Sequence, residues 1–394
     1  MALTQISIPP VVSLAGNPIY ISYSTNKNSE DFIGIHLKVY TVNDASWNLQ
    51  GDELRYEPDS TGKIEVDIQK LLEWDPNKEF TWPDVDADLI THQANLLKQY
   101  KVEVSEKYGN PLTEDDTDTV FGLFVLPGSI SKLQQGYLNS ISDTWLENQS
   151  SSNKFLTNSP TKKTDVWASE RLYFLIINNP YAGRVNLKVR IDYIGSSATH
   201  TAETIRYIYD HYILHLVTSF STLLLGLIDN EKEVLQYTVW LTSGNDTILS
   251  EEFTYTMDNV RHSNTKYFIF NNAFKVAEGA RFTSQYKESS NYSFQKSQRT
   301  LDKGFNMDSP SLIKSNTQET KSCEITSDWL TIEEMNWLRE LLTSESVYEI
   351  VNGNLIPVFI DTESVNILEG NNNLRALSIS YIYAHPDKVP VISI

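Results

Sequence analysis

The sequence predicts a mainly β protein with two or three tandem β-sandwich-like domains, long polar excursions, and one C-terminal helix plus a hairpin. Short apolar runs recur along the chain between clusters of Asn, Gly, Asp and Pro, a pattern typical of strands joined by turns. The 394 residues include 21 Tyr and 8 Trp, and such rings favour half-buried pleated surfaces. A chain of this length is also too long for one ordinary hydrophobic core.

The first domain is predicted over residues 1–130 as an N-terminal β-sandwich. Its strand-like runs are "NPIYISYS", "FIGIHLKVYTV", "KIEVDI", "YKVEVSEKYG" and "TVFGLFVLPG". Short strands at this spacing suggest a sandwich. The composition then shifts to Gln, Asn, Ser and Thr, so residues 131–165 are predicted to form a polar linker or excursion.

A second β-sandwich is predicted over residues 166–260. It contains the runs "RLYFLIINNPYAGRVNLKVRIDYIG", "ETIRYIYDHYILHLV", "LLLGLI" and "EVLQYTVWL". The most apolar segment, His211 to Ile228, is interrupted by His, Thr and Ser and falls short of what a membrane-spanning helix needs. We therefore interpret it as two buried strands and predict no membrane span.

The third domain, residues 261–394, is predicted to be β-rich and to contain a helix over about 332–342. It opens with "TKYFIFNNAF" and passes through a polar segment, Ser284–Lys321, before the helix. Thr331 and Glu334 form a capping box for this helix. Its apolar side chains recur at helical spacing. Then "VYEIVNGNLIPVFI" predicts a tight hairpin around its Asn-Gly pair, and "LRALSISYIYA" predicts a final strand.

Composition argues against several partners. The formal charge of −19, from 32 basic and 51 acidic side chains, argues against a surface dominated by the clustered Lys and Arg that nucleic acid needs. The single cysteine, Cys323, cannot form an intrachain disulfide. The N-terminal residues lack a basic region and do not resemble a secretory signal.

One acidic stretch, "YEPDSTGKIEVDIQKLLEW", begins like a calcium loop. Glu57, Asp59 and Thr61 fall on the positions of the oxygen ligands in such a loop, and Gly62 falls on the position of its glycine. However, Ile68 stands where a bidentate Glu is required. Lys63 to Ile68 alternates as a half-buried strand does. We interpret the stretch as a turn, a strand, and a short helix with Asp67 as its cap.

Two further acidic clusters partly match a cation-binding loop. The first has three carboxylates on alternate positions, namely Asp84, Asp86 and Asp88. Leu89 and Asn95 stand where a calcium loop requires Gly and Glu, so a solvated turn is favoured. The second is a run of four carboxylates, Glu114, Asp115, Asp116 and Asp118. We expect it to be a charged loop preceding a strand from Thr119.

Histidines and catalytic motifs give no enzyme site. His211 and His215, with His200 nearby, would suit zinc only on a helix, whereas their surroundings alternate as a strand with polar-face histidines does. No phosphate-binding glycine loop, nucleophile elbow or activated cysteine occurs in the sequence. A pair of catalytic carboxylates, as in glycoside hydrolysis, could be distant in the sequence, but nothing singles out such a pair. We predict no catalytic, cofactor-binding or metal residues and no enzymatic activity.

Exposed aromatic residues offer an alternative function. Trp47, Trp74 and Trp82 could form a sugar-binding platform on a sandwich, because aromatic rings present flat apolar faces. The interpretation that these rings fill cores and subunit interfaces is favoured, since the Trp residues lie inside apolar runs. Glycan binding therefore remains an unsupported alternative.

Several stretches together resemble virion structural proteins of phages and prophages that infect Bacteroidetes. They are "LAGNPIYISYS", "YEPDSTGKIEVDIQKLLEW", "YFIFNNAF" and, near the C-terminal end, "WLTIEEMNWLRELLTS". Where such proteins often carry a Gly-rich turn, this chain has "NNAFKVAEGARF". The resemblance implies a tail, baseplate or collar ring protein with no catalytic residues to transfer.

The expected function is therefore that of a subunit assembled in the host bacterial cytoplasm into a virion. Its expected partners are copies of itself in a homo-oligomeric ring and other virion or tail proteins, bound through β-sandwich surfaces and extended segments. The polar segments Gln134 to Lys163 and Ser284 to Lys321 are expected to order on contact with such partners. The alternative is a carbohydrate-binding or host-recognition β-sandwich protein.

Overall fold

The computed structural model confirms the mainly β class, with 59% of residues in strands and 7% in helices. The structure describes residues 3–25, 32–43, 46–73, 88–93, 96–108, 113–130, 153–176, 184–206, 212–229, 231–260, 262–300, 303–304, 308, 310–361, 366–369 and 375–384. The chain divides into two compact units. Unit 1 comprises residues 1–158, 170–257 and 272–276, and unit 2 comprises residues 159–169, 258–271 and 277–394.

Unit 1 begins with two sheets that share one core. The strands are β1 (Leu3–Ser7), β2 (Val12–Leu14), β3 (Tyr20–Thr25), β4 (Phe32–Asn43), β5 (Ser46–Leu49), β6 (Leu54–Tyr56), β7 (Lys63–Asp67), β9 (Lys98–Tyr108) and β10 (Thr113–Leu126). One sheet has the order β1-β3-β7 and the other the order β2-β10-β9-β4-β5, with β6 also paired to β4. Alternate residues such as Ile64 and Val66 on β7, and Val102 and Val104 on β9, fill the core between them.

A second core in unit 1 contains a strand that comes from within the first third of the chain. The elements are β8 (Ile90–Gln93), β12 (Arg171–Ile176), β13 (Val185–Tyr193), β14 (Ser196–Ile205), β15 (Tyr212–Val217), α4 (Phe220–Leu223), β16 (Val234–Ser243) and β17 (Phe253–Met257). One sheet has the order β12-β15-β8, and the strands β17-β16-β13-β14 are neighbours in another. Ile90 of β8 packs in this core, and its N–H donates to Glu203 Oε2 at 2.8 Å. The prediction of one sandwich over residues 1–130 did not include a strand that joins the second core.

Unit 2 is built on one long antiparallel sheet. Its elements are β11 (Lys162–Thr164), β18 (Lys266–Asn271), β19 (Ala277–Phe282), β20 (Tyr286–Gln298), β21 (Leu312–Thr326), α5 (Ile332–Leu338), α6 (Glu340–Thr343), β22 (Val347–Val351), β23 (Asn354–Ile360), β24 (Asn366–Glu369) and β25 (Arg375–Tyr383). The sheet order is β19-β18-β22-β23-β25-β21-β20, with β24 also paired to β25. Phe268, Phe282, Leu341 and Tyr381 are among the residues of its core.

Local signals near the C-terminal end are confirmed. Thr331 Oγ1 accepts the Glu334 N–H and Glu334 Oε2 accepts the Thr331 N–H, so the capping box is complete. The predicted helix is divided at Arg339 into α5 and α6. Asn352 and Gly353, with φ of 50° and 78°, join β22 to β23. Both residues take the left-handed conformation that a two-residue hairpin turn requires.

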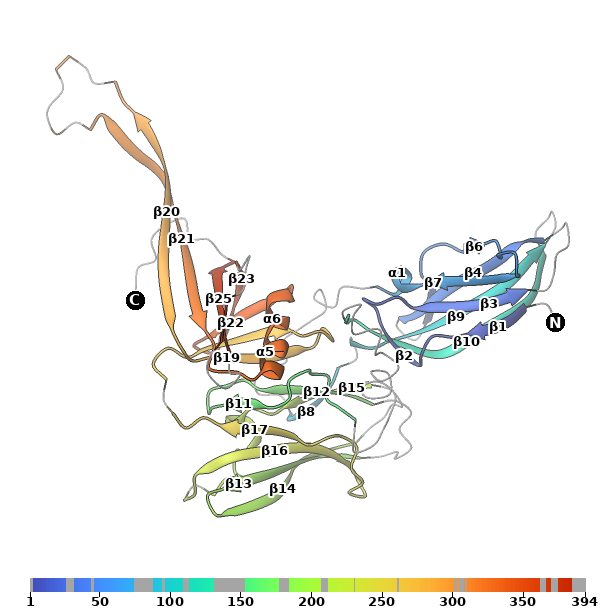
Figure 1. Ribbon diagram of the computed structural model, residues 1–394, viewed down its shortest axis with the longest axis horizontal. Coiled ribbons are helices and arrows are strands. Elements are labelled where there is room, and N and C mark those ends of the chain that lie inside the picture. The colour runs from blue at the N-terminus through green and yellow to red at the C-terminus, as the bar shows by residue number, and fades with distance from the viewer. Residues whose placement is uncertain are drawn as a thin grey trace. The chain divides into compact units, whose positions relative to one another are not determined.

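One sequence interpretation is wrong, and two polar segments contain structure that the sequence did not indicate. The run "LLLGLI" is the end of α4 followed by turns, so the segment from His211 to Ile228 holds one strand instead of two. Phe155 and Leu156, which fall in the predicted polar linker, are 0% and 1% exposed; residues 131–152 of that linker lie outside the described part. The polar segment Ser284–Lys321 forms β20 and most of β21 (Figure 1).

A glycine comparison tests the turn before β7. Gly62 has φ of +77°, and an added methyl group would collide with the carbonyl oxygen of Thr25, whose N–H donates to the Gly62 carbonyl. Gly195 has φ of +80° and open space around it. We expect Gly195→Ala to lower the free energy of unfolding by about 1–2 kcal/mol, the cost of a left-handed backbone. Gly62→Ala should lower it by more, as measured by urea denaturation; equal losses would contradict this packing.

Candidate functional site

The calcium-like stretch is a turn, as predicted. Asp59 Oδ1 accepts hydrogen bonds from Thr61 N at 2.7 Å, Thr61 Oγ1 at 2.7 Å and Lys63 N at 3.0 Å. These bonds lower the pKa of the Asp59 carboxyl, with the Lys63 N–H as the largest cause. Asp67 Oδ1 accepts the Gln69 N–H at 3.0 Å at the start of α1 (Gln69–Leu72). The carboxylate oxygens of this stretch thus stabilise its own backbone.

The other acidic clusters do not gather into a cation site in the part that the structure describes. Asp84, Asp86 and Asn95 lie outside that part, and Asp88 is exposed. The expected loop from Glu114 to Asp118 is instead the first half of β10, paired with β9 and broken by a bulge at Asp116. No group of three or more His, Cys, Asp or Glu side chains lies at metal-binding spacing among the described residues.

His215 is fully buried, which corrects the prediction that it lies on a polar strand face. It lies on β15, the middle strand of β12-β15-β8, so neighbouring strands flank it on both sides. Its Nδ1 is 3.0 Å from Thr91 Oγ1 and its Nε2 is 3.1 Å from Arg171 Nη1. Burial, aided by the Arg171 charge, lowers the pKa of His215 to about 3. The neutral ring therefore accepts a hydrogen bond from the Arg171 guanidinium at Nε2 and donates one from Nδ1 to Thr91 Oγ1.

The outer face of the first sandwich carries an aromatic patch, which we define as Tyr40, Trp47, Lys101 and Phe121. The Lys101 ammonium lies 4.5 Å from the Tyr40 ring centroid, 5.2 Å from that of Trp47 and 5.8 Å from that of Phe121. It is also 2.6 Å from Glu103 Oε1. Phe121 is 63% exposed and Trp47 38% exposed. Lys101 thus already covers part of the ring faces that a sugar would use.

Of the three tryptophans in the sugar-platform hypothesis, the structure describes Trp47. Trp74 and Trp82 lie outside the described residues, and Trp47 stands on β5 opposite Val42 of β4. Sequence reasoning did not single out Tyr40, Lys101 and Phe121. The pairing of β10, β9, β4 and β5 brings these residues together, and no local spacing encodes that order.

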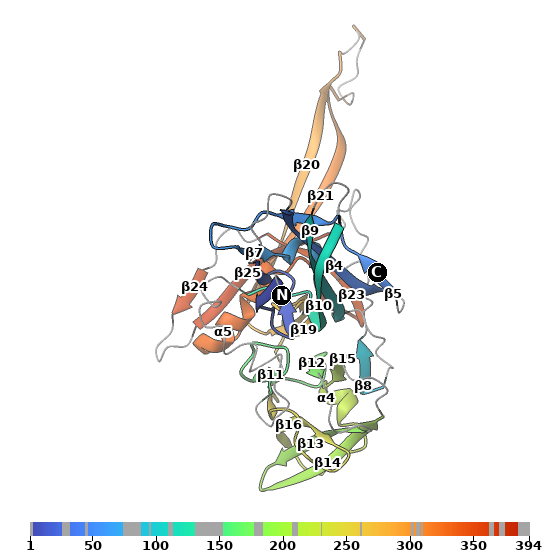
Figure 2. The ribbon, with the colours of Figure 1, turned by 90° about the vertical axis from the view of Figure 1, so that its right-hand side faces the viewer.

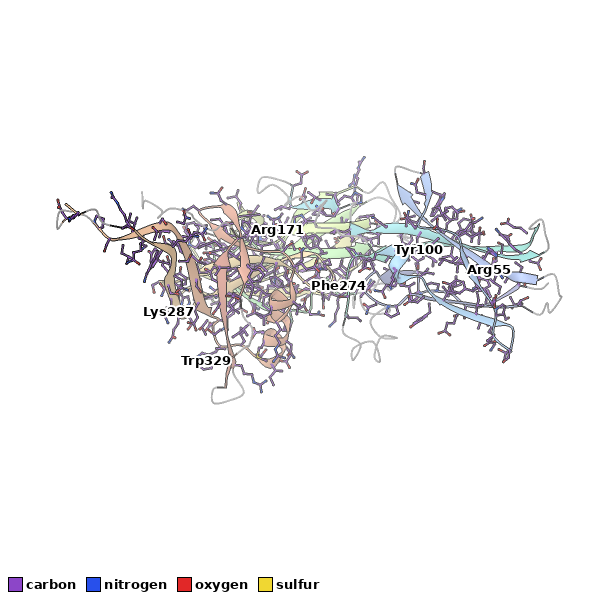
Figure 3. All side chains as sticks on the ribbon, turned by 90° about the horizontal axis from the view of Figure 1, so that it is seen from above. Arg55, Tyr100, Arg171, Phe274, Lys287 and Trp329 are labelled. Carbon is purple, nitrogen blue, oxygen red and sulfur yellow. The ribbon has the colours of Figure 1, made fainter. Side chains whose placement is uncertain are left out.

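The most extended surface is the β20–β21 hairpin, which we call the arm (residues 286–326; Figures 1 and 2). Its base is fixed in the unit 2 core, because Ser322 to Thr326 pair with Ile382 to Ser378 of β25. Cys323 and Ile325 are fully buried there. Lys287 lies on β20 in this lower part (Figure 3).

A buried carboxylate lies on the strands beside the base. Glu349 of β22 is fully buried and accepts from Lys266 Nζ at 2.6 Å, Tyr381 OH at 3.1 Å and Tyr383 OH at 2.9 Å. Burial and the Glu349 charge raise the pKa of Tyr383. Because one donor is cationic and all the groups lie in strands of one sheet, the charge is satisfied without a metal or ligand.

The outer part of the arm pairs only with itself among the described strands. Residues 290–298 of β20 face residues 312–321 of β21, and β25 reaches only as far as Ser322. Cross-strand bonds hold the ribbon: Tyr292 OH donates to Glu319 Oε1 at 2.9 Å, and Asn316 Nδ2 donates to Gln295 Oε1 at 2.7 Å. Both outer edges of this two-stranded ribbon therefore present backbone groups to the solvent.

Large apolar side chains project from the arm into solvent. Every residue of β20 after Tyr286 is exposed. Two large exposed side chains lie on β20, Tyr292 at 53% and Phe294 at 42%, and two lie on β21, Leu312 at 59% and Ile313 at 38%. A two-stranded hairpin alone is at best marginally stable in water, and clustered exposed apolar groups mark interaction sites. The arm is thus the described feature whose form is best explained by a partner.

Sequence reasoning missed the arm because Ser, Gln, Asn and Lys dominate it. The available signal was the β-favouring Tyr292 and Phe294 in one run, and Ile313 with Thr317 and Thr320 in the next. These residues do not alternate with a continuous buried face, because Glu319 is the one buried residue among the described residues 287–298 and 312–321.

Comparisons with known proteins do not identify the chain. No protein-family model matches it, and no curated protein matches it by sequence. The extracellular region of plexin A4, domains 1 to 10, aligns with a TM-score of 0.18 and 10% identity over 98% of this chain and 31% of that chain. A partial N-terminal region of an enterococcal surface protein aligns with a TM-score of 0.14 and 10% identity over 65% and 94%. Scores this low assign neither fold nor function.

The buried histidine gives a prediction on pH. The pKa of His215 falls from 6.5 to about 3 on folding, so the unfolded chain binds the extra proton between these values. Stability therefore falls as pH drops through this window. We expect His215→Gln to reduce the slope of unfolding free energy against pH by up to about 1.4 kcal/mol per pH unit, measured by urea denaturation. An unchanged slope would show that His215 is not buried in its neutral form.

Proposed function

We propose that the chain is a non-enzymatic structural subunit and that its arm anchors it to neighbouring subunits. The single observation that carries this proposal is the outer part of the arm, a two-stranded ribbon whose side chains are mostly exposed and which pairs with no third strand among the described residues. Binding along an edge or face would bury Tyr292, Phe294, Leu312 and Ile313. Strand addition of this kind draws its affinity from backbone hydrogen bonds and its specificity from side chains.

We further propose that the assembly is a phage tail, baseplate or collar ring, formed in the host bacterial cytoplasm and carried in the virion. The support for this setting is the resemblance of the stretches "LAGNPIYISYS" and "WLTIEEMNWLRELLTS" to such proteins. Among the described residues, no helix is long and apolar enough to cross a membrane. The expected partners are copies of the chain and other virion proteins.

Shortening the arm tests the structural proposal. Ser290 and Lys321 are a register pair, so residues 291–320 can be replaced by Asn-Gly, which closes a two-residue hairpin. We expect the full chain to form multimers, alone or with virion proteins, and the shortened chain to remain monomeric in light scattering.

The shortened chain has an internal control for folding. The base from Ser322 to Thr326 and the Glu349 cluster are retained, so the thermal midpoint of unit 2 should change little. A full chain that stays monomeric at all concentrations and never accompanies virion proteins would contradict the proposal. A shortened chain that assembles as well as the full chain would also contradict the role of the arm.

A second candidate function, carbohydrate binding, rests on the aromatic patch. Trp47 and Phe121 are exposed on one face, and the Lys101–Glu103 pair beside them offers hydrogen bonds to hydroxyl groups. This function predicts millimolar to micromolar glycan binding that Trp47→Ala weakens at least tenfold, as measured by calorimetry. Trp167→Ala is the matched control, because Trp167 is 78% exposed and outside the patch. Equal binding by both variants would reject the patch as a glycan site.

A further inference from the structure

Charge is distributed unevenly along this acidic chain. Residues 1–130, which form the first sandwich and also contain β8 of the second core, have 21 Asp and Glu against 9 Lys and Arg, so they hold 12 of the 19 excess negative charges. Exposed carboxylates in this region include Asp52, Glu65 and Glu73, whereas Glu57 and Glu114 form ion pairs with Arg55 and Lys107. A second copy of the chain therefore offers a strongly acidic surface.

The arm has the opposite balance. Residues 286–326 contain 6 Lys and Arg against 5 Asp and Glu, and residues 294–316 contain 4 against 2. The four basic residues near its end are Lys296, Arg299, Lys303 and Lys314, and all are exposed. The outer part of the arm is thus a basic segment on a chain that is otherwise strongly acidic.

Two of these basic residues, Lys296 and Lys314, lie beside the exposed side chain of Phe294. Lys314 Nζ lies 4.3 Å and Lys296 Nζ 5.5 Å from the ring centroid of Phe294. Lys296 and Lys314 are directly opposite each other in the register. An apolar centre with a charged rim is the usual composition of a specific protein interface. Phe294 would supply buried area, and the lysines would supply orientation and a fast association rate.

We infer that the outer part of the arm docks on the acidic first sandwich of a second copy of this chain. This inference rests on the proposed structural function and names the partner of the same surface. Opposite charges favour contact between the arm of one copy and the sandwich of the next, whereas two arms or two acidic sandwiches would repel. The contact joins different surfaces of the two copies, so it is heterologous and generates a closed ring or an open filament.

Reversing the arm charge tests the inference with a matched control. The double variant K296E/R299E changes the charge of the arm, and K232E/R339E makes the same change of charge at exposed residues elsewhere. We expect the arm variant to weaken self-association at least tenfold in analytical ultracentrifugation, and the control to weaken it less than threefold. Raising the salt from 0.05 to 0.5 M should weaken association of the unmodified chain, because screening shortens the range of these charges. Equal effects of the two double variants would overturn the inference.

Crosslinking then identifies the surface that the arm contacts. Phe294 is replaced by the photoreactive benzoyl-phenylalanine in an isotopically labelled chain, which is mixed with unlabelled chain. We expect crosslinks from position 294 to residues 1–130 of the unlabelled copy. Crosslinks only to residues 153–394, only within one copy, or only to a nucleic acid or a different protein would overturn the inference.

The two proposals fail in different ways. If the shortened chain loses assembly but K296E/R299E does not, the arm remains the anchor and its acidic partner is wrong. If the full chain never assembles, the structural function itself fails. If assembly survives shortening of the arm, both the anchor and its partner are rejected.

Discussion

The arm is held at one end only, and this constraint governs how the structure is interpreted. Five register pairs join Ser322–Thr326 to β25, and beyond Ser322 the described ribbon is held only by its own cross-strand bonds. A ribbon that has no third strand and buries little apolar surface gains little from the hydrophobic effect. Its length is therefore difficult to explain by the stability of the single chain, and the proposed partner would supply the missing burial.

The core of unit 2 holds the base of the arm in place. Cys323 and Ile325 in the base of the arm are fully buried, and the buried Glu349 receives one ammonium and two phenol donors from β18 and β25. Removing any one of those donors would leave a buried charge less well satisfied, which is costly. A fixed base lets the orientation of unit 2 determine where the arm points, so an assembly using it would inherit a defined geometry.

Local chemistry could be predicted from the sequence, whereas long-range pairing could not. Asp59, the Thr331–Glu334 box and the Asn352–Gly353 turn each act within a few residues, so their sequence patterns determine the outcome. The burial of His215 depends on β8, whose Thr91 lies 124 residues earlier in the chain, and the aromatic patch depends on the order of four strands. The arm was misjudged for a related reason, because its polar composition resembles a loop and no buried face produces alternation.

Hydrogen exchange of the backbone amides tests the central claim most directly, because it reports which edges of the arm gain a partner. Residues 322–325 pair with both β20 and β25 and should exchange slowly in every state. We predict that amides within residues 287–298 and 312–321 exchange rapidly in the dilute chain and slow at least tenfold in the assembled particle. Exchange in these segments that remains equally rapid after assembly would contradict the account.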